Sequence, residues 1–228
     1  MTTTPIPLNG ADLTALPSGA LWYAARRLLC VSDLHLGKSE RMARRSGALI
    51  PPYDSRETLD RLAQDVSRWQ PEQVICLGDN FDDELAVAGI ADAEHDRLNA
   101  MKAGRHWIWI TGNHDPGPVG ISGTWQDEVQ IDGLTFRHIA QSGAPNGEIS
   151  GHYHPKHRLC GARSTLTRRA FIYDDTRLIL PAYGTYTGGL RSTDPAIRNL
   201  FGDTAVAVLT GRKTLPCPLH ADMQSRRR

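Results

Sequence analysis

Three short apolar runs in the first half of the chain each end abruptly in polar residues, and helical sequence separates them. The runs are residues 27–32 (RLLCVS), 73–77 (QVICL) and 105–111 (RHWIWIT), and we expect each to form a buried strand. Residues 54–69 carry apolar side chains at three- and four-residue spacing, and residues 84–102 also favour a helix. Strands that alternate with helices indicate an α/β fold with a parallel sheet.

The sequence after residue 115 favours strands over helices. Short β-like runs separated by turn residues are expected at 126–131, 134–139, 148–151, 170–174 and 178–180. Because no repeat or low-complexity linker divides the chain, we expect a single domain over residues 1–228. Residues 1–19 and 221–228 are expected to be peripheral or flexible.

Composition narrows the class of protein. The 228 residues include 26 Lys and Arg and 25 Asp and Glu, a formal net charge of +1, which excludes a strongly basic nucleic-acid coat. The longest apolar runs are far shorter than the roughly 18 to 20 residues that span a bilayer. The first residues lack the pattern of an export signal, and the 4 cysteines form no CxxC pair. We therefore expect a soluble, cytoplasmic protein with no membrane partner.

Carboxylate, amide and imidazole side chains follow the predicted strands. In chain order these residues are Asp33, His35, Asp79, Asn113, His114, Asp115, His138, His152 and His154. Neighbouring strands of one sheet bring their ends to a common edge, and these donor types together suit Mn²⁺, Fe²⁺ or Zn²⁺. Seven of them are candidate ligands, more than one mononuclear site uses, which favours a pair of metal ions.

The motifs DLH (33–35), GD (78–79), GNHD (112–115), a later histidine and GHYH (151–154) resemble those of the calcineurin-like metallophosphoesterase superfamily. The resemblance implies a two-sheet α/β sandwich with a dinuclear metal site at the strand ends. It implies that Asp79 bridges the two ions. It places Asp33, His35 and His154 at one ion, and Asn113, His138 and His152 at the other. For His138 a buried structural role stays open, since FRHIA carries no flanking motif.

The same resemblance implies catalytic roles for His114 and Asp115. An imidazolium at His114, oriented by a carboxylate, would stabilise charge on the phosphoryl oxygens and protonate the leaving group. The metal pair would lower the pKa of a bridging water. Mn²⁺ is the expected metal, with Fe²⁺ and Zn²⁺ as alternatives.

Longer stretches are similar to the PdeM group of ligase-associated DNA damage response endonucleases. These are residues 33–54, the GHYHP sequence, and LPAYGTYTGGL at 180–190. This similarity implies a DNA or RNA substrate and DNA ligase and helicase partners. The group often has a histidine where this chain has Asp82, so no role is predicted for that residue. Residues 183–190 are expected to close the second sheet or, less favourably, to line the cleft.

A basic segment follows the first metal motif directly, with side chains at Lys38, Arg41, Arg44 and Arg45. Two interpretations stay open: contacts to nucleic-acid phosphates beside the scissile one, or a solvated helix face.

The function that these residues favour is metal-dependent phosphodiester hydrolysis in a DNA repair setting. A phosphomonoesterase or small-molecule phosphodiesterase on the same scaffold is an alternative, because only the pocket would differ. A non-catalytic scaffold for repair partners is less favoured, since such a protein would be expected to have lost some of these side chains.

Overall fold

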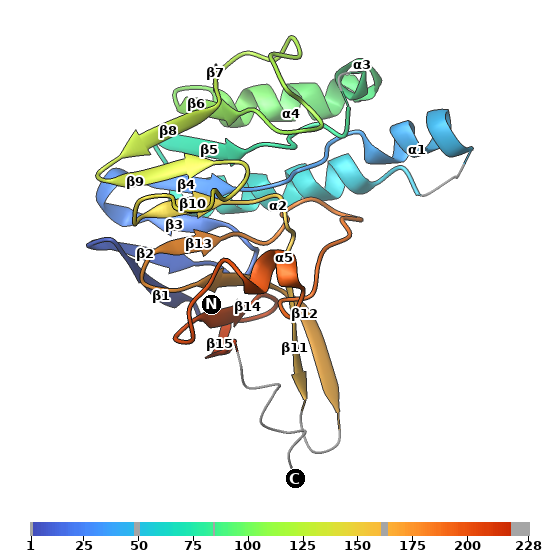
Figure 1. The fold of residues 1–228 in the computed structure, drawn as a ribbon. Coiled ribbons are helices and arrows are strands. Elements are labelled where there is room, and N and C mark those ends of the chain that lie inside the picture. The colour runs from blue at the N-terminus through green and yellow to red at the C-terminus, as the bar shows by residue number, and fades with distance from the viewer. Residues whose placement is uncertain (1, 48–50, 84, 161–163, 220–228) are drawn as a thin grey trace.

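The computed structural model describes residues 2–47, 51–83, 85–160 and 164–219. Its strands form two sheets that pack face to face, and helices α2 (Asp54–Trp69) and α4 (Asp92–Lys102) cover the outer face of the first (Figure 1). Within these residues no helix is both long and apolar enough to cross a membrane. The two-sheet α/β sandwich expected from the sequence is confirmed.

The first sheet has strand order β1-β2-β3-β4-β5-β6-β7. Its pairs are antiparallel from β1 to β4 and parallel from β4 to β7, so the carboxyl ends of β4, β5 and β6 meet at one edge. The strands are β1 (Thr4–Leu8), β2 (Ala11–Ala15), β3 (Leu21–Tyr23), β4 (Leu28–Val31), β5 (Gln73–Leu77), β6 (His106–Ile110) and β7 (Thr124–Gln126).

The second sheet has strand order β15-β14-β12-β13-β10-β9-β8, with β11 paired to β12. Its strands are β8 (Glu128–Ile131), β9 (Leu134–Arg137), β10 (Glu148–Ser150), β11 (Lys156–Cys160), β12 (Thr165–Tyr173), β13 (Arg177–Ile179), β14 (Val206–Leu209) and β15 (Leu215–Pro218). Strand β10 runs parallel to both neighbours, so its carboxyl end and that of β9 lie on the same side. The β11–β12 hairpin projects away from the sheets (Figure 1).

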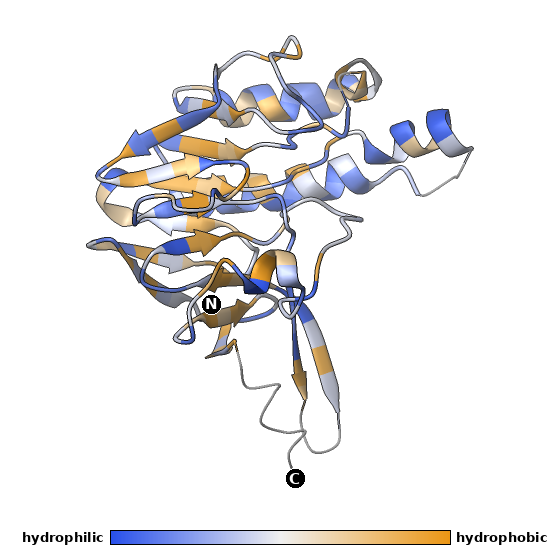
Figure 2. Ribbon diagram, viewed as in Figure 1, coloured by the Kyte–Doolittle hydropathy of each residue, from blue (hydrophilic) through white to orange (hydrophobic). Residues whose placement is uncertain are grey.

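Three apolar clusters hold these layers together. The first fills the space between the sheets and includes Ile75, Ile108, Phe136 and Phe171. The second joins the first sheet to α2 and α4, and the third packs the second sheet against α5 (Pro195–Arg198). Figure 2 shows the apolar residues concentrated on the central strands, whereas α1 (Lys38–Ser46) is largely hydrophilic.

Two expected elements are each divided in the structure. Residues 84–102 form α3 (Ala86–Gly89) and α4, because the backbone is extended at Ile90 and Ala91; residue 84 lies outside the described part. The expected strand at 126–131 is two strands, β7 in the first sheet and β8 in the second. The chain crosses between sheets there, which a pattern of apolar residues alone does not reveal.

The amino-terminal residues are not peripheral as expected. Strands β1 and β2 extend the first sheet, and their alternate side chains Ile6, Leu8 and Leu13 are buried between the sheets. Pro5 and Pro7 point outward from β1, which is compatible with a strand at the sheet edge. The expectation for residues 221–228 falls outside the described residues.

Candidate metal centre

The polar residues predicted from the strand ends come together at one edge of the two sheets. Each follows a strand directly, so the strand fixes where its loop begins. From the first sheet come Asp33 and His35 after β4, Asp79 after β5, and Asn113, His114 and Asp115 after β6; from the second come His138 after β9, and His152 and His154 after β10.

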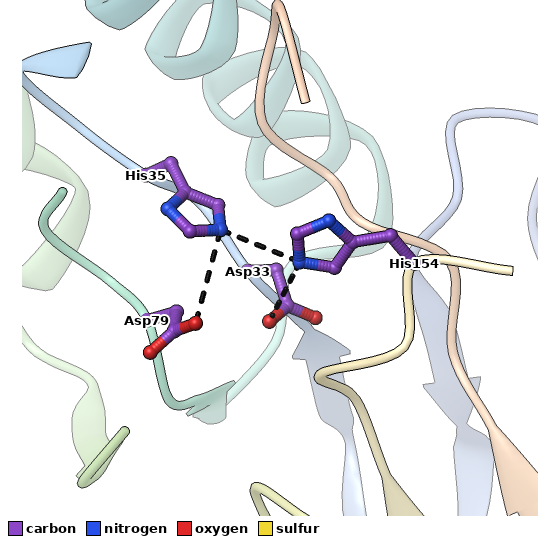
Figure 3. Close-up of side chains that lie close together, drawn as sticks. All are labelled: Asp33, His35, Asp79 and His154. Atoms are coloured by element: carbon purple, nitrogen blue, oxygen red, sulfur yellow. Dashed lines mark hydrogen bonds and ion pairs between the residues drawn. The ribbon is translucent and has the colours of Figure 1, made fainter. Parts of the chain in front are cut away.

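Asp33, His35, Asp79 and His154 form the first group, and their donor atoms lie within 4.8 Å of one another. His154 Nε2 is 3.2 Å from Asp33 Oδ1 and 3.3 Å from His35 Nε2. His35 Nε2 is 3.9 Å from Asp79 Oδ2. Figure 3 shows these four side chains converging from three loops.

Asp79, His138 and His152 form the second group, again within 4.8 Å. His138 Nε2 lies 3.4 Å from Asp79 Oδ1, 3.2 Å from His152 Nδ1 and 3.0 Å from Asn113 Oδ1. Asp79 therefore belongs to both groups and directs one carboxylate oxygen to each.

The imidazole tautomers make these groups suited to cations. His138 Nδ1 donates a hydrogen bond to the Leu77 carbonyl at 2.9 Å. In the neutral ring Nε2 therefore carries a lone pair, which faces the oxygens of Asn113 and Asp79. His35 Nδ1 donates to Asp82 at 2.8 Å, so its Nε2 is likewise a lone pair beside Asp79. Lone pairs that face one another at these distances need a cation or a proton between them.

The electrostatics of the metal-free protein agree with this. Burial favours the neutral form of Asp33 and Asp79, but the neighbouring histidines outweigh it and hold the pKa of both carboxyls below the usual range. Burial alone would lower the pKa of His138, yet the hydrogen bond to Asp79 and the charge of Asp33 raise it to about 9. Without metal, a proton on His138 thus supplies the positive charge that the carboxylates require.

Backbone strain is concentrated in the same residues. Asp33, His35, Asp79, His152 and His154 all have positive φ angles, between 46° and 68°. A non-glycine residue in this region is disfavoured, and such strain gathers at functional sites where the surrounding structure enforces it. Here hydrogen bonds enforce it: the Asp33 amide donates to Gly78, the His35 amide to Asp79, and the His152 amide to Asp33.

Close backbone approach also requires glycine beside the ligands. A Cβ atom at Gly112 would lie 2.1 Å from the Asp79 amide nitrogen. One at Gly151 would lie 1.7 Å from Ser32 Oγ and 2.6 Å from Asp33 Oδ2. These loops could not pack as they do with any side chain at either position.

His114 lies beside the shared Asp79, with its ring 5.1 Å from the ring of His35, and it lines a cavity. Its amide donates to Asp79 Oδ1 at 2.9 Å, and its Nδ1 lies 2.8 Å from the Asp82 carbonyl oxygen, to which it donates. The ring nitrogen Nε2 is therefore the one available for a substrate. A cavity of about 340 Å³ adjoins it, lined by Arg45, Asn113 and His114 among others.

The structure corrects the expected role of Asp115 as the group that orients His114. The Asp115 carboxylate is fully buried and accepts hydrogen bonds from the backbone amides of Asn80, Phe81 and Gly112. Burial raises its pKa to about 6 despite these bonds. Asp115 therefore ties the loop after β6 to the loop after β5, and the Asp82 carbonyl is what orients the His114 ring.

Asp82 is the functional residue that the sequence did not predict. Its fully buried carboxylate binds His35 Nδ1 and also pairs with Lys38 and Arg41. Burial opposes its ionisation, but the His35, Lys38 and Arg41 contacts hold its pKa at about 2. A carboxylate behind a ligand histidine fixes the ring orientation, and the acidic pair in GDNFDD was the available sequence signal.

The basic segment forms α1, and its four side chains have two different surroundings. Lys38 and Arg41 are directed to Asp82 and are largely covered. Arg44 and Arg45 pair with Asp83 at 2.9 and 3.6 Å and are more exposed, and Arg45 also lines the cavity beside His114. The segment is therefore not a purely solvated helix face, and its four cations are not all available to bind phosphate.

Residues 183–190 do not close the second sheet as a strand. The Tyr183 and Gly184 amides donate to the carbonyls of Ser32 and Asp33, and the Thr185 amide donates to Thr58 Oγ1 in α2. This segment therefore supports the Asp33 loop from behind. Tyr186, which is 43% exposed, is its one exposed aromatic residue.

Comparison with known proteins agrees with this geometry. The calcineurin-like phosphoesterase family model matches residues 26–192. A search of curated proteins gave no significant match. Among solved structures, the Pseudomonas putida nuclease MPE is similar with a TM-score of 0.74 and 27% sequence identity, over 95% of this chain and 100% of that one. The chain belongs to the calcineurin-like phosphoesterase family and is a metal-dependent phosphoesterase.

Proposed function

We propose that this phosphoesterase is a phosphodiesterase that cleaves nucleic acid with the help of two divalent ions. The observation that carries the proposal is the shared carboxylate of Asp79, which directs Oδ2 to the first donor group and Oδ1 to the second. The nuclease activity in the name of the similar Pseudomonas putida protein supports the choice of substrate.

The proposed ligand sets follow the two donor groups. Asp33, His35 and His154 would hold one ion, and Asn113, His138 and His152 the other, with Asp79 shared. The mixture of imidazole, carboxylate and amide donors fits Mn²⁺, our proposed metal, and also Fe²⁺ or Zn²⁺. When bound, such ions supply Lewis acidity that neutralises phosphoryl charge and lowers the pKa of a water molecule.

His114 would act on the leaving group. The Asp82 carbonyl accepts its Nδ1 proton, so Nε2 of the imidazolium carries a proton toward the cavity. From there it would stabilise charge on a phosphoryl oxygen and protonate the departing alkoxide. Arg45, which also lines the cavity, would bind a phosphate next to the scissile one, and Arg44 would extend this contact.

A role in DNA repair, with DNA ligase and helicase partners, is the finer part of the proposal and is supported by the sequence similarity to the PdeM group alone. A cytoplasmic location is proposed with it.

The first experiment compares bis-p-nitrophenyl phosphate with p-nitrophenyl phosphate as substrates of metal-stripped protein, with Mn²⁺ added back. We expect diester turnover well above monoester turnover, lost in His114→Ala. Monoester preference would favour a phosphatase instead. If protein with two bound ions hydrolysed neither substrate, a non-catalytic binding scaffold would be favoured. The complete set of metal donors argues against that alternative.

A further inference from the structure

A second concave surface lies outside the candidate metal centre. It is a groove of about 1280 Å³, with α2 as one wall and residues of β11 and β12 as the other. Pockets for single small ligands span roughly 300 to 1,000 Å³. The groove is therefore large enough for a segment of a polymer.

The groove concentrates positive charge in a chain whose net charge is only +1. Seven basic side chains line it, against two acidic ones, Asp60 and Asp65. Both carboxylates have protein partners: Asp60 pairs with Arg97, and Asp65 accepts the Tyr183 hydroxyl at 2.9 Å. The other six basic side chains form no ion pair with a carboxylate in the described part of the chain. They are Arg61, Arg68, Lys156, Arg168, Arg169 and Arg212.

Two of these cations are held together at the floor of the groove. Arg61 and Arg169 both donate to the Tyr183 carbonyl oxygen, and Arg61 also lies 4.8 Å from the centre of the Tyr183 ring. Burial and the adjacent Arg61 charge lower the pKa of Arg169 to about 10. Asp65 and Glu57 act on Arg61 and Arg169 electrostatically but form no ion pair with them in the described chain, so an anion would stabilise these converging guanidinium groups.

Hydrogen bonds join one part of the groove lining to the loop that carries Asp33. Tyr183, which binds both arginines, donates its own amide to Ser32, and Gly184 donates to Asp33. On the other wall, Lys156 begins β11 two residues after His154. The part of the groove at Arg61, Arg169 and Lys156 therefore lies next to the segments that carry Asp33 and His154.

We propose that this groove binds the sugar–phosphate backbone of single-stranded nucleic acid that flanks the cleaved bond. Proteins that bind single strands regardless of sequence use positively charged grooves with aromatic side chains. Trp69 lines this groove, and its ring centre lies 5.4 Å from that of Trp22. The inference rests on the proposed nuclease function for its biological meaning, but binding can be measured without catalysis.

The test uses a groove variant and a charge-matched control. In the variant, the exposed arginines Arg68, Arg168 and Arg212 are replaced by glutamine. In the control, glutamine replaces three basic residues that do not line the groove, namely Arg26, Lys102 and Arg198. Affinity for a labelled single-stranded oligonucleotide, and for its duplex, is measured by fluorescence anisotropy in EDTA over a series of salt concentrations. Turnover of bis-p-nitrophenyl phosphate is measured with Mn²⁺.

We expect the groove variant to bind the strand at least about 10-fold more weakly and to lose about two units of the salt slope, while the control changes little. Small-diester turnover should stay at the wild-type level in both. Equal weakening in variant and control, tighter binding of duplex than of single strand, or full affinity in the variant would each overturn the proposal. Absent diester turnover in wild-type protein would instead count against the proposed function and leave the binding result to stand.

Discussion

The Asp82 carboxylate lies 2.8 Å from Nδ1 of His35, on the opposite side of the ring from the Nε2 atom that faces Asp79 and His154. Asp82 therefore determines which nitrogen of His35 carries the proton. Lys38 and Arg41 compensate the buried charge of this carboxylate, so α1 contributes to the metal centre through Asp82.

Replacing Asp82 with asparagine should lower Mn²⁺ affinity by about 10- to 100-fold, because partners behind a ligand typically have effects of this size. Isothermal titration calorimetry of the metal-free protein measures the Mn²⁺ affinity. Asp83→Asn is the matched control, since Asp83 contacts Arg44 and Arg45 but no candidate ligand in the described structure. If both variants bound Mn²⁺ like wild type, Asp82 would not orient His35.

His114→Ala should keep both ions yet lose about 10²- to 10⁴-fold in turnover, the range for a positioned general acid. The reason is that the His114 ring contacts the Asp82 carbonyl and the cavity, whereas its backbone amide, which alanine retains, makes the bond to Asp79. Metal content and bis-p-nitrophenyl phosphate hydrolysis are measured together. His106→Ala, at an exposed site on β6, is the control and should be fully active.

Metal binding should release protons. Despite burial, the Asp79 hydrogen bond and the Asp33 charge raise the pKa of His138 to about 9, so near pH 7.5 the metal-free protein holds a proton that a cation must displace. Apparent Mn²⁺ affinity should consequently rise with pH up to about 9. Titration calorimetry in two buffers of different ionisation enthalpy counts the protons released. His138→Gln should release about one fewer, and an unchanged number would contradict a protonated His138.

Much of the candidate metal centre could be predicted because its donors follow strands in short motifs. The structure brings all seven predicted ligands together, including His138, which has no flanking motif. Asp82 and Asp115 could not be assigned in the same way. Asp82 lies in the acidic run GDNFDD and Asp115 in the motif GNHD, and only the three-dimensional path of the loops shows that Asp82 contacts a histidine while Asp115 binds backbone amides.

In the fold, too, elements with a strong local pattern could be predicted, whereas those that depend on long-range pairing could not. Helix α2 and strand β5 have the bounds expected from the sequence, because each shows a strong local apolar pattern. Strand β1 was missed although Thr4, Ile6 and Leu8 alternate with exposed residues, since its two prolines argue against a strand away from a sheet edge. That residues 126–131 change sheets depends on long-range pairing, which local sequence does not encode.

Gly112→Ala should reduce both stability and metal binding, because the added Cβ would lie 2.1 Å from the Asp79 amide nitrogen and 2.8 Å from Asp115 Oδ1. Relief of this contact must move Asp79, the carboxylate shared by both donor groups, and overpacking of this kind costs about 1 to 3 kcal/mol. Gly117→Ala in the same loop is the control, since its Cβ would meet no atom within 4 Å. Urea denaturation and Mn²⁺ content should therefore separate the two variants, and a Gly112→Ala protein that matched Gly117→Ala in both would show that the loops after β5 and β6 can shift without disturbing Asp79.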